Sequence, residues 1–406
     1  MFLDVLKRLF GPKLFGPKML ADPYPLYARL RSTDPVSWAD QFGGWVLTRY
    51  ADVTAVLRSP DASSDRAAAV RQRVGPEFQG MFELRSHMML NADPPRHTRL
   101  RMLVNKAFTP KTVEELAPFI RAFVDKALDA AAARGRMELM ADLAFPLPAT
   151  VIAEMLGVPA EDRDRFKQWS DDTTAAAGNL PSNLSPEVLR KSVEGIRALQ
   201  AYFRDIIARR RAEPRDDLIS GLIKAQEEGD RLSDQELLAN CVLLLNAGHE
   251  TTTNLIGNGT YALLRHCDQR KRLHDDPSLI PTAVEELLRY DSPVQFTHRI
   301  LTADVELGGK TLRAGQVVLL LLAAANRDPE QFPDPDKLDV GRQNNKHVAF
   351  GLGSHFCLGA PLARLEGRFV FEALLRRAPN LRLDGPAPRY RQNFNLRGLE
   401  SLHVSL

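Results

Sequence analysis

Cysteine is scarce in this sequence. Cys241, Cys267 and Cys357 are its three cysteines in 406 residues, and they lie far apart. An odd, widely spaced set gives no disulfide framework and is typical of a reducing compartment, so we expect a cytoplasmic protein. The set also lacks the closely spaced ligands of a structural zinc site.

The sequence also lacks an excess of one charge and a long apolar run. It has 54 Lys and Arg residues against 51 Asp and Glu residues, a net charge of +3, which gives no case for nucleic-acid binding. The apolar, basic segment 1–19 is interrupted by Pro12 and Pro17, so it is too short to span a bilayer. It also lacks the apolar core of a signal peptide. We expect a tail over 1–19 and one domain over 20–406.

Strand patterns are few and short. They cover 43–50, 305–322 and the C-terminal 399–406, and the turn LGGKTL within the second predicts a hairpin. No alternation of strands with helices is present, and no glycine-rich phosphate loop follows a strand. We therefore predict a mainly α fold with small β-sheets in a single large domain.

Long helices dominate the pattern. Apolar residues at helical spacing predict helices over 112–134, 185–211 and 233–266. Ser233 and Glu236 form a capping box at the start of the third, a long central helix of roughly 50 Å at about 1.5 Å per residue. The turn-rich segment 175–185 lies between two helical patterns and is a candidate lid.

The stretch FGLGSHFCLG, residues 350–359, surrounds Cys357 with glycines. The residues that follow predict an amphipathic helix with Pro361 in its first turn, so the thiol lies at a helix N-terminus. Unpaired backbone N–H groups and the helix dipole favour the thiolate there. This segment alone fits a metal-bound thiolate best, and it leaves open a cysteine nucleophile with His355 as its base or a buried structural thiol.

Five residues of this stretch form the pattern F-x-x-G-x-H-x-C-x-G: Phe350, Gly353, His355, Cys357 and Gly359. The pattern resembles the haem-binding signature of the cytochrome P450 family, the haem-thiolate monooxygenases. Further motifs resemble the family in the same order along the chain: HTRLR at 97–101, AGHETT at 247–252, EELLR at 285–289 and RGLESLHV at 397–404. The resemblance covers essentially all of 20–406.

The resemblance implies haem b, a protoporphyrin IX iron, with Cys357 as the metal ligand. Family positions that contact this cofactor correspond to His97, Arg101, Ala247, Gly248, Arg299, Phe350, Gly351, His355, Gly359 and Ala363. The four basic residues of this set would hold the haem propionates, because buried carboxylates need paired donors. A thiolate ligand favours O–O cleavage.

The resemblance also implies roles for two further groups. Glu250 and Thr251 match the family's catalytic acid–alcohol pair, which delivers protons during oxygen activation. Glu286 and Arg289 match a structural pair that a later arginine joins, here Arg342.

The implied reaction inserts one oxygen atom from O2 into a C–H bond or C=C bond of an apolar small molecule. Electrons would come from NAD(P)H through a separate ferredoxin and ferredoxin reductase, steered by basic residues at Lys106, Lys111, Arg364 and Arg368. The family's substrate-pocket positions correspond to Phe82, Met88, Met89, Leu244, Ala247, Val294, Gln295 and Phe394. We expect a monomer with no membrane span.

Two other classes of haem protein would also carry this signature. A haem sensor or carrier would not need Glu250 and Thr251. A peroxide-driven hydroxylase would replace this pair with a site for a substrate carboxylate. Relatives with the same motifs oxidise terpenes, fatty acids, steroids and macrolides, so the motifs do not name the substrate.

Overall fold

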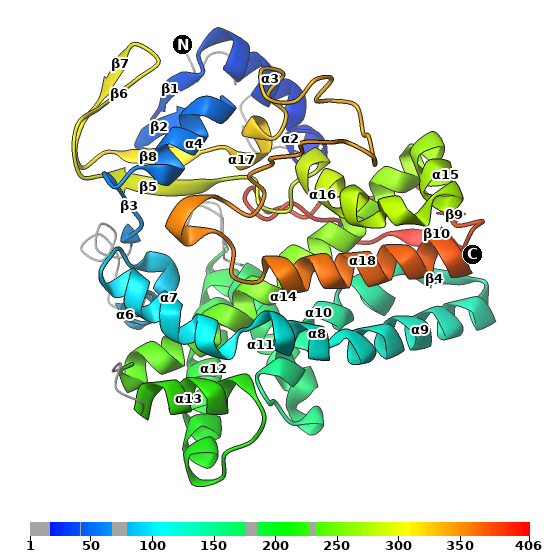
Figure 1. Ribbon diagram of the computed structural model, residues 1–406, viewed down its shortest axis with the longest axis horizontal. Helices are drawn as coiled ribbons and strands as arrows, with labels where there is room; N and C mark the ends of the chain where they lie inside the picture. The colour runs from blue at the N-terminus through cyan, green and yellow to red at the C-terminus, as the bar shows by residue number, and fades with distance from the viewer. Residues whose placement is uncertain (1–16, 41, 67–78, 176–184, 228–231) are drawn as a thin grey trace. The chain divides into compact units, whose positions relative to one another are not determined.

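The computed structural model describes residues 17–40, 42–66, 79–175, 185–227 and 232–406. Its α-helices are α2 Pro17–Ala21, α3 Tyr24–Thr33, α4 Tyr50–Arg58, α6 Gln79–Ser86, α7 Arg96–Ala107, α8 Pro110–Glu115, α9 Ala117–Arg134, α10 Pro146–Met155, α11 Arg163–Ala175, α12 Pro186–Ala212, α13 Leu218–Glu227, α14 Asp234–Arg265, α15 Cys267–Asp275, α16 Ile280–Tyr290, α17 Leu322–Ala325 and α18 Ala360–Arg377 (Figure 1). Shorter helical turns are η2 Met89–Asn91, η3 Met140–Ala144, η4 Ala160–Asp162, η6 Pro277–Leu279 and η7 Gly353–His355.

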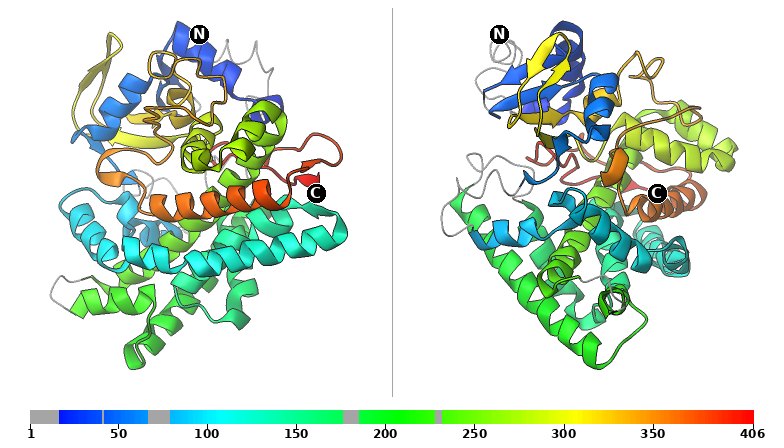
Figure 2. Two further views of the ribbon diagram at one scale, coloured as in Figure 1. Left: turned by 45° about the vertical axis from the view of Figure 1, so that its right-hand side comes forward. Right: turned by 60° about the vertical axis from the view of Figure 1, so that its left-hand side comes forward.

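The strands form small sheets, so the predicted mainly α class is confirmed. They are β1 Val36–Ala39, β2 Gly44–Leu47, β3 Ala62–Ser63, β4 Arg136–Glu138, β5 Thr297–Leu301, β6 Val305–Leu307, β7 Lys310–Leu312, β8 Val317–Leu320, β9 Arg382–Leu383 and β10 His403–Ser405. The largest sheet has the order β1-β2-β8-β5-β3, and β6 and β7 form the predicted hairpin. In the right-hand view of Figure 2 the blue and yellow strands of this sheet, far apart in the sequence, lie side by side.

Helices α3 and α4 cover opposite faces of this sheet, as the alternating side chains of β8 show. Val318 and Leu320 pack with Val53 of α4, whereas Leu319 packs with Tyr27 of α3. Successive side chains of a strand point to opposite faces, so each helix covers one face. Met19, which falls within the predicted tail, is 3% exposed and packs on the α3 side.

The two longest helices begin with side-chain caps, one of which the sequence predicts. The Ser185 hydroxyl accepts the Val188 N–H at the start of α12. At the start of α14, Ser233 and Glu236 exchange hydrogen bonds of 3.1 and 3.0 Å, which confirms the capping box.

The single helix predicted over 112–134 is wrong, because the structure has α8 and α9 with a break at Leu116. Pro118 is the physical reason. It has no N–H to continue the helical ladder, so one hydrogen bond of a continuous helix is lost at this point. Gly135, with φ +67°, ends α9 where the sequence predicts an end.

The described residues group into two compact units. The first comprises 1–62, 121–145 and 251–406, and the second comprises 63–120 and 146–250, each within the described ranges. In the first unit, α18 runs beside α9 (Figures 1 and 2), where Arg121 stacks on Phe369 and Arg377 binds Asp125.

In the second unit, α11 packs along α12 through Phe166, Trp169, Tyr202 and Phe203. The candidate lid over 175–185 lies outside the described residues, except for its two ends.

Of the helices that the structure describes, none combines the length and the apolar composition that crossing a membrane requires.

Candidate active site

Cys357 lies in a tight loop between η7 and α18, and its side chain is half-buried. Its N–H donates to the Phe350 carbonyl at 2.9 Å, which closes the loop around the thiol. Gly351 and Gly353 have φ values of +69° and +76°, a region that other residues rarely adopt. A Cβ on Gly353 would also lie 2.8 Å from the Leu57 carbonyl oxygen. Both its backbone conformation and this close approach therefore require glycine.

Helix α16 anchors this loop through Glu285. Its carboxylate accepts hydrogen bonds from Arg364 at 2.7 and 2.8 Å and contacts His347 Nε2 at 3.2 Å. Burial raises the pKa of Glu285, but the bonds from Arg364 and His347 outweigh it and lower the pKa to about 2. The Arg364 guanidinium lies 4.7 Å from the ring centre of Phe350. The sequence analysis missed Glu285, although it adjoins Glu286 in the EELLR motif.

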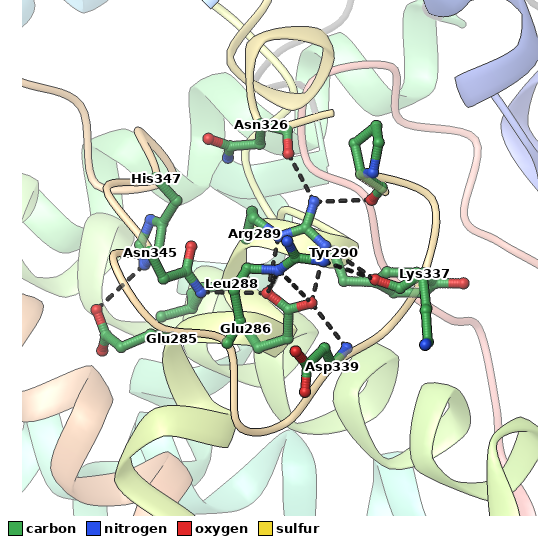
Figure 3. Close-up of polar contacts among 12 residues, drawn as sticks. Glu285, Glu286, Leu288, Arg289, Tyr290, Asn326, Lys337, Asp339, Asn345 and His347 are labelled. Carbon is green, nitrogen blue, oxygen red and sulfur yellow. Dashed lines mark hydrogen bonds and ion pairs between the residues drawn. The ribbon is translucent and has the colours of Figure 1, made fainter. Parts of the chain in front are cut away.

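The next residue of α16, Glu286, is fully buried with Arg289 (Figure 3). Arg289 donates to both carboxylate oxygens at 2.7 and 2.8 Å. Arg342 Nε lies 3.2 and 3.1 Å from the same two oxygens. The Asp339 N–H and the Asn345 amide also donate to Glu286, at 2.9 and 3.2 Å. The structure thus brings together the three residues of the predicted triad.

The AGHETT motif lies in the middle of α14. Ala247 is exposed, Gly248 and Thr251 are half-buried, and Glu250 is 5% exposed. A Cβ on Gly248 would lie 3.5 Å from Ile152 of α10, an ordinary van der Waals contact, so α10 alone does not require glycine at this position.

A polar link that the sequence analysis missed joins α11 to α14. The Ser170 hydroxyl lies 3.2 Å from His249 Nδ1, and the Thr173 hydroxyl donates to the Asn246 amide oxygen at 3.0 Å. Ser170 is fully buried, and Thr173 and His249 are 5% and 1% exposed. His249 and Asn246 flank Ala247 and Gly248, so α11 is bound to the segment that carries the motif.

The predicted propionate donors are distributed over both units. His97 is 2% exposed and precedes the half-buried Arg101 by one turn on α7 in the second unit. Arg299 on β5 is 4% exposed, and His355 is half-buried in the cysteine loop, both in the first unit.

The predicted pocket residues of the first unit differ in their surroundings. Phe394 stacks on Phe42, with ring centres 6.1 Å apart, and on Phe296, at 5.2 Å. Val294 is half-buried and bridges to the segment that follows Phe394. Gln295 is 2% exposed, accepts from the Tyr27 hydroxyl and donates to the Ser292 carbonyl. These bonds occupy both ends of the Gln295 amide and give it a structural role.

The pocket residues of the second unit are mainly buried. Met88, Met89 and Leu244 are 6–8% exposed, and Phe82 is half-buried. The Asn240 amide oxygen of α14 accepts the Met89 N–H at 3.0 Å, which fixes the methionine segment to the central helix.

The residues present fit a haem. A Cβ on Gly359, two residues after Cys357, would meet no described atom within 4 Å, so this side of the loop is open to a bound group. Buried His97 and Arg299 are the donors that buried carboxylates need. A half-buried thiol beside the N-terminus of α18 suits a thiolate ligand.

Comparison with known proteins decides the family. The model of the family described as Cytochrome P450 matches residues 46–378. The chain belongs to this family. Vitamin D(3) 25-hydroxylase of Pseudonocardia autotrophica is 44% identical, with 97% of this chain and 96% of the relative covered. The biotin biosynthesis cytochrome P450 of Bacillus subtilis (strain 168) is 41% identical over 96% of this chain and 97% of the relative.

Solved structures of P450 enzymes have the same fold. P450BioI, in complex with an acyl carrier protein ligated to hexadec-9Z-enoic acid, has a TM-score of 0.88 and 39% identity, with 96% of this chain and 99% of that chain covered. CYP109E1 from Bacillus megaterium in complex with testosterone has a TM-score of 0.84 and 36% identity over 95% and 99% of the two chains. This P450 is therefore a haem-thiolate monooxygenase of small molecules that uses O2 and receives electrons from NAD(P)H through redox partners.

Proposed function

We propose that the Cys357 thiolate would hold the iron of haem b in this P450 and that the chain hydroxylates an apolar small molecule. The observation that carries the proposal is the loop geometry. The 2.9 Å bond from the Cys357 N–H to the Phe350 carbonyl and two left-handed glycines fix the thiol just before α18. When bound, the haem activates O2 for insertion of one oxygen atom into a C–H bond or C=C bond.

Four basic residues would hold the haem carboxylates: His97, Arg101, Arg299 and His355. Burial of His97 and Arg299 strengthens their hydrogen bonds to carboxylates, because little water competes there. Gly351, Gly359 and Ala363 would leave space for the macrocycle near the cysteine, and Phe350 would pack beside it.

Glu250 and Thr251 would move protons. They follow each other on α14, so their side chains point about 100° apart around the helix. Thr251 would donate from its hydroxyl on the side that Ala247 also occupies, one turn earlier. Glu250 would receive protons from water and pass them on.

The substrate would be recognised by apolar contacts. The half-buried stack of Phe42, Phe296 and Phe394 presents flat aromatic surface, and Met88 and Met89 add side chains that adapt to several shapes. Relatives are named for vitamin D3 and bound to testosterone or a C16 acyl group, all large and apolar. We infer a substrate of this class.

The redox partner would be a ferredoxin, reduced by a ferredoxin reductase. Lys106, Lys111 and Arg368 are exposed and can attract an acidic protein. Lys111 lies 3.7 Å from Glu115 in an exposed pair, which contributes little. Arg364 is half-buried and donates two hydrogen bonds to Glu285, so we assign it to the cysteine loop instead. We further propose that the protein is a cytoplasmic monomer.

Titration of the purified protein with vitamin D3, testosterone and hexadec-9Z-enoic acid tests this proposal. A substrate should shift the haem iron from low to high spin, and it should yield a hydroxylated product with O2, NADH, ferredoxin and reductase. Binding without any NADH-dependent product would favour a carrier or sensor. Product with hydrogen peroxide alone would favour a peroxide-driven hydroxylase.

A further inference from the structure

A cavity of about 380 Å³ lies between the C-terminal ends of α14 and α18 and helix α15, all in the first unit. The residues that line this cavity are not those predicted to bind the haem. Thr260 is the lining residue nearest to Thr251 along α14, and it lies nine residues further on, or ~13 Å at about 1.5 Å per residue. Phe371 of the same lining lies 14 residues after Cys357. None of the motifs of the proposed function includes these residues.

The inner wall of this cavity is apolar. It consists of the buried side chains of Leu263, Leu264, Phe371, Leu374 and Leu381. The volume lies within the range of roughly 300–1,000 Å³ that small-molecule pockets have, and such pockets combine apolar walls with a few polar groups.

Helix α15 supplies the polar groups of the cavity, which are basic. Arg270, Lys271 and His274 line the cavity, and no Asp or Glu is among the described lining residues. Arg270 donates Nη1 to the Leu381 carbonyl, while Lys271 pairs with Asp275 at 2.5 Å. The other guanidinium N–H groups of Arg270 leave it donors for a ligand.

We propose that this cavity binds a small amphipathic anion, a carboxylate on an apolar chain. The chain packs on the leucines and Phe371, and the carboxylate meets Arg270 at α15. The site is distinct from the haem site and does not depend on the substrate proposed above.

Cys267 provides a direct readout, because it lines the same cavity and is exposed. Cys241 is buried, and burial raises its thiol pKa to about 12, so it reacts slowly. In the haem-loaded enzyme Cys357 is coordinated. Alkylation by iodoacetamide, followed by mass spectrometry, therefore measures access to Cys267.

The probes are decanoate and 1-decanol, added to the haem-loaded enzyme. At about ten times its Kd, decanoate should slow alkylation of Cys267 roughly tenfold, since only about a tenth of the sites stay open. 1-Decanol, which lacks the carboxylate, should bind more weakly. An unchanged rate with decanoate, or equal protection by 1-decanol, would overturn the proposal.

Variants separate the contributions of single residues. Arg270→Gln should weaken decanoate binding roughly tenfold through loss of a charge-assisted hydrogen bond. Leu375→Trp, at the half-buried edge of the cavity, should abolish protection. The Soret band of each variant reports its folding.

Imidazole, which occupies the haem iron, separates the two sites. Protection of Cys267 should persist with imidazole bound. Protection that imidazole abolishes would assign the effect to the haem site and contradict the proposal.

Discussion

The Glu285 carboxylate accepts two hydrogen bonds from Arg364, at 2.7 and 2.8 Å, and so joins α16 to the helix that follows Cys357. Its neighbour Glu286 faces Arg289 and the segment that carries Arg342. Two consecutive acidic residues of α16 thus bind two different segments, α18 and the segment around Arg342. Helix α16 therefore helps to hold the helix that follows Cys357.

Glu286→Ala should destabilise the protein strongly. Arg289 and Arg342 are 0% and 9% exposed at their side chains, so the substitution leaves two buried cations without their carboxylate. Loss of one partner of a buried ion pair costs about 3–5 kcal/mol. Urea unfolding of the purified variant measures this change, and little haem should remain bound.

The matched control is Glu194→Ala, which removes an exposed ion pair with Arg190 on α12. Exposed pairs contribute little, so its unfolding curve should overlay the wild type. A Glu286→Ala protein with normal haem content and normal stability would contradict a structural triad.

Glu285→Gln should remove a pH-dependent part of stability. The pKa of Glu285 is about 2 in the folded protein, below its ordinary value of 4.5. The stabilisation by its charge is therefore fully present above about pH 4.5 and is lost as the pH falls towards 2. The gap in unfolding midpoint between wild type and variant should be wide at pH 5 and narrow at about pH 3. A gap that does not change with pH would contradict this assignment.

Local signals in the sequence predicted much of this fold. Ser185 and Ser233 mark the starts of α12 and α14 because capping depends on residues close in sequence. The break at Leu116 could have been predicted from Pro118. The structural role of Gln295 could not have been predicted from local sequence, because the Tyr27 hydroxyl that donates to it lies 268 residues away. The pair Ser170–His249, 79 residues apart, is likewise fixed by packing of α11 on α14, which no local pattern reveals.

Thr251→Ala should uncouple the reaction. Without the hydroxyl, protons are not delivered in order, so NADH consumption continues while product falls and hydrogen peroxide rises. The ratio of product to NADH, with peroxide assayed in parallel, measures the effect. Thr251→Ser keeps the hydroxyl and should restore coupling. An unchanged ratio in Thr251→Ala would remove Thr251 from the catalytic machinery.

A double-mutant cycle should detect the link between α11 and α14. Thr173→Val and Asn246→Ala each remove one side of the 3.0 Å hydrogen bond. A typical intramolecular hydrogen bond contributes about 0.5–1.5 kcal/mol, so the free energies of unfolding should show a coupling of that size. Additive effects would mean that the bond contributes nothing to stability.

The most direct test of the central claim is the absorption spectrum of the reduced, CO-bound protein. Thiolate ligation by Cys357 predicts a Soret band at the long-wavelength position characteristic of haem-thiolate proteins. Cys357→His should move the band to the position of imidazole-ligated haem, and Cys267→Ser should leave it unchanged. A wild-type band at the imidazole position, or one that Cys357→His does not move, would contradict the account.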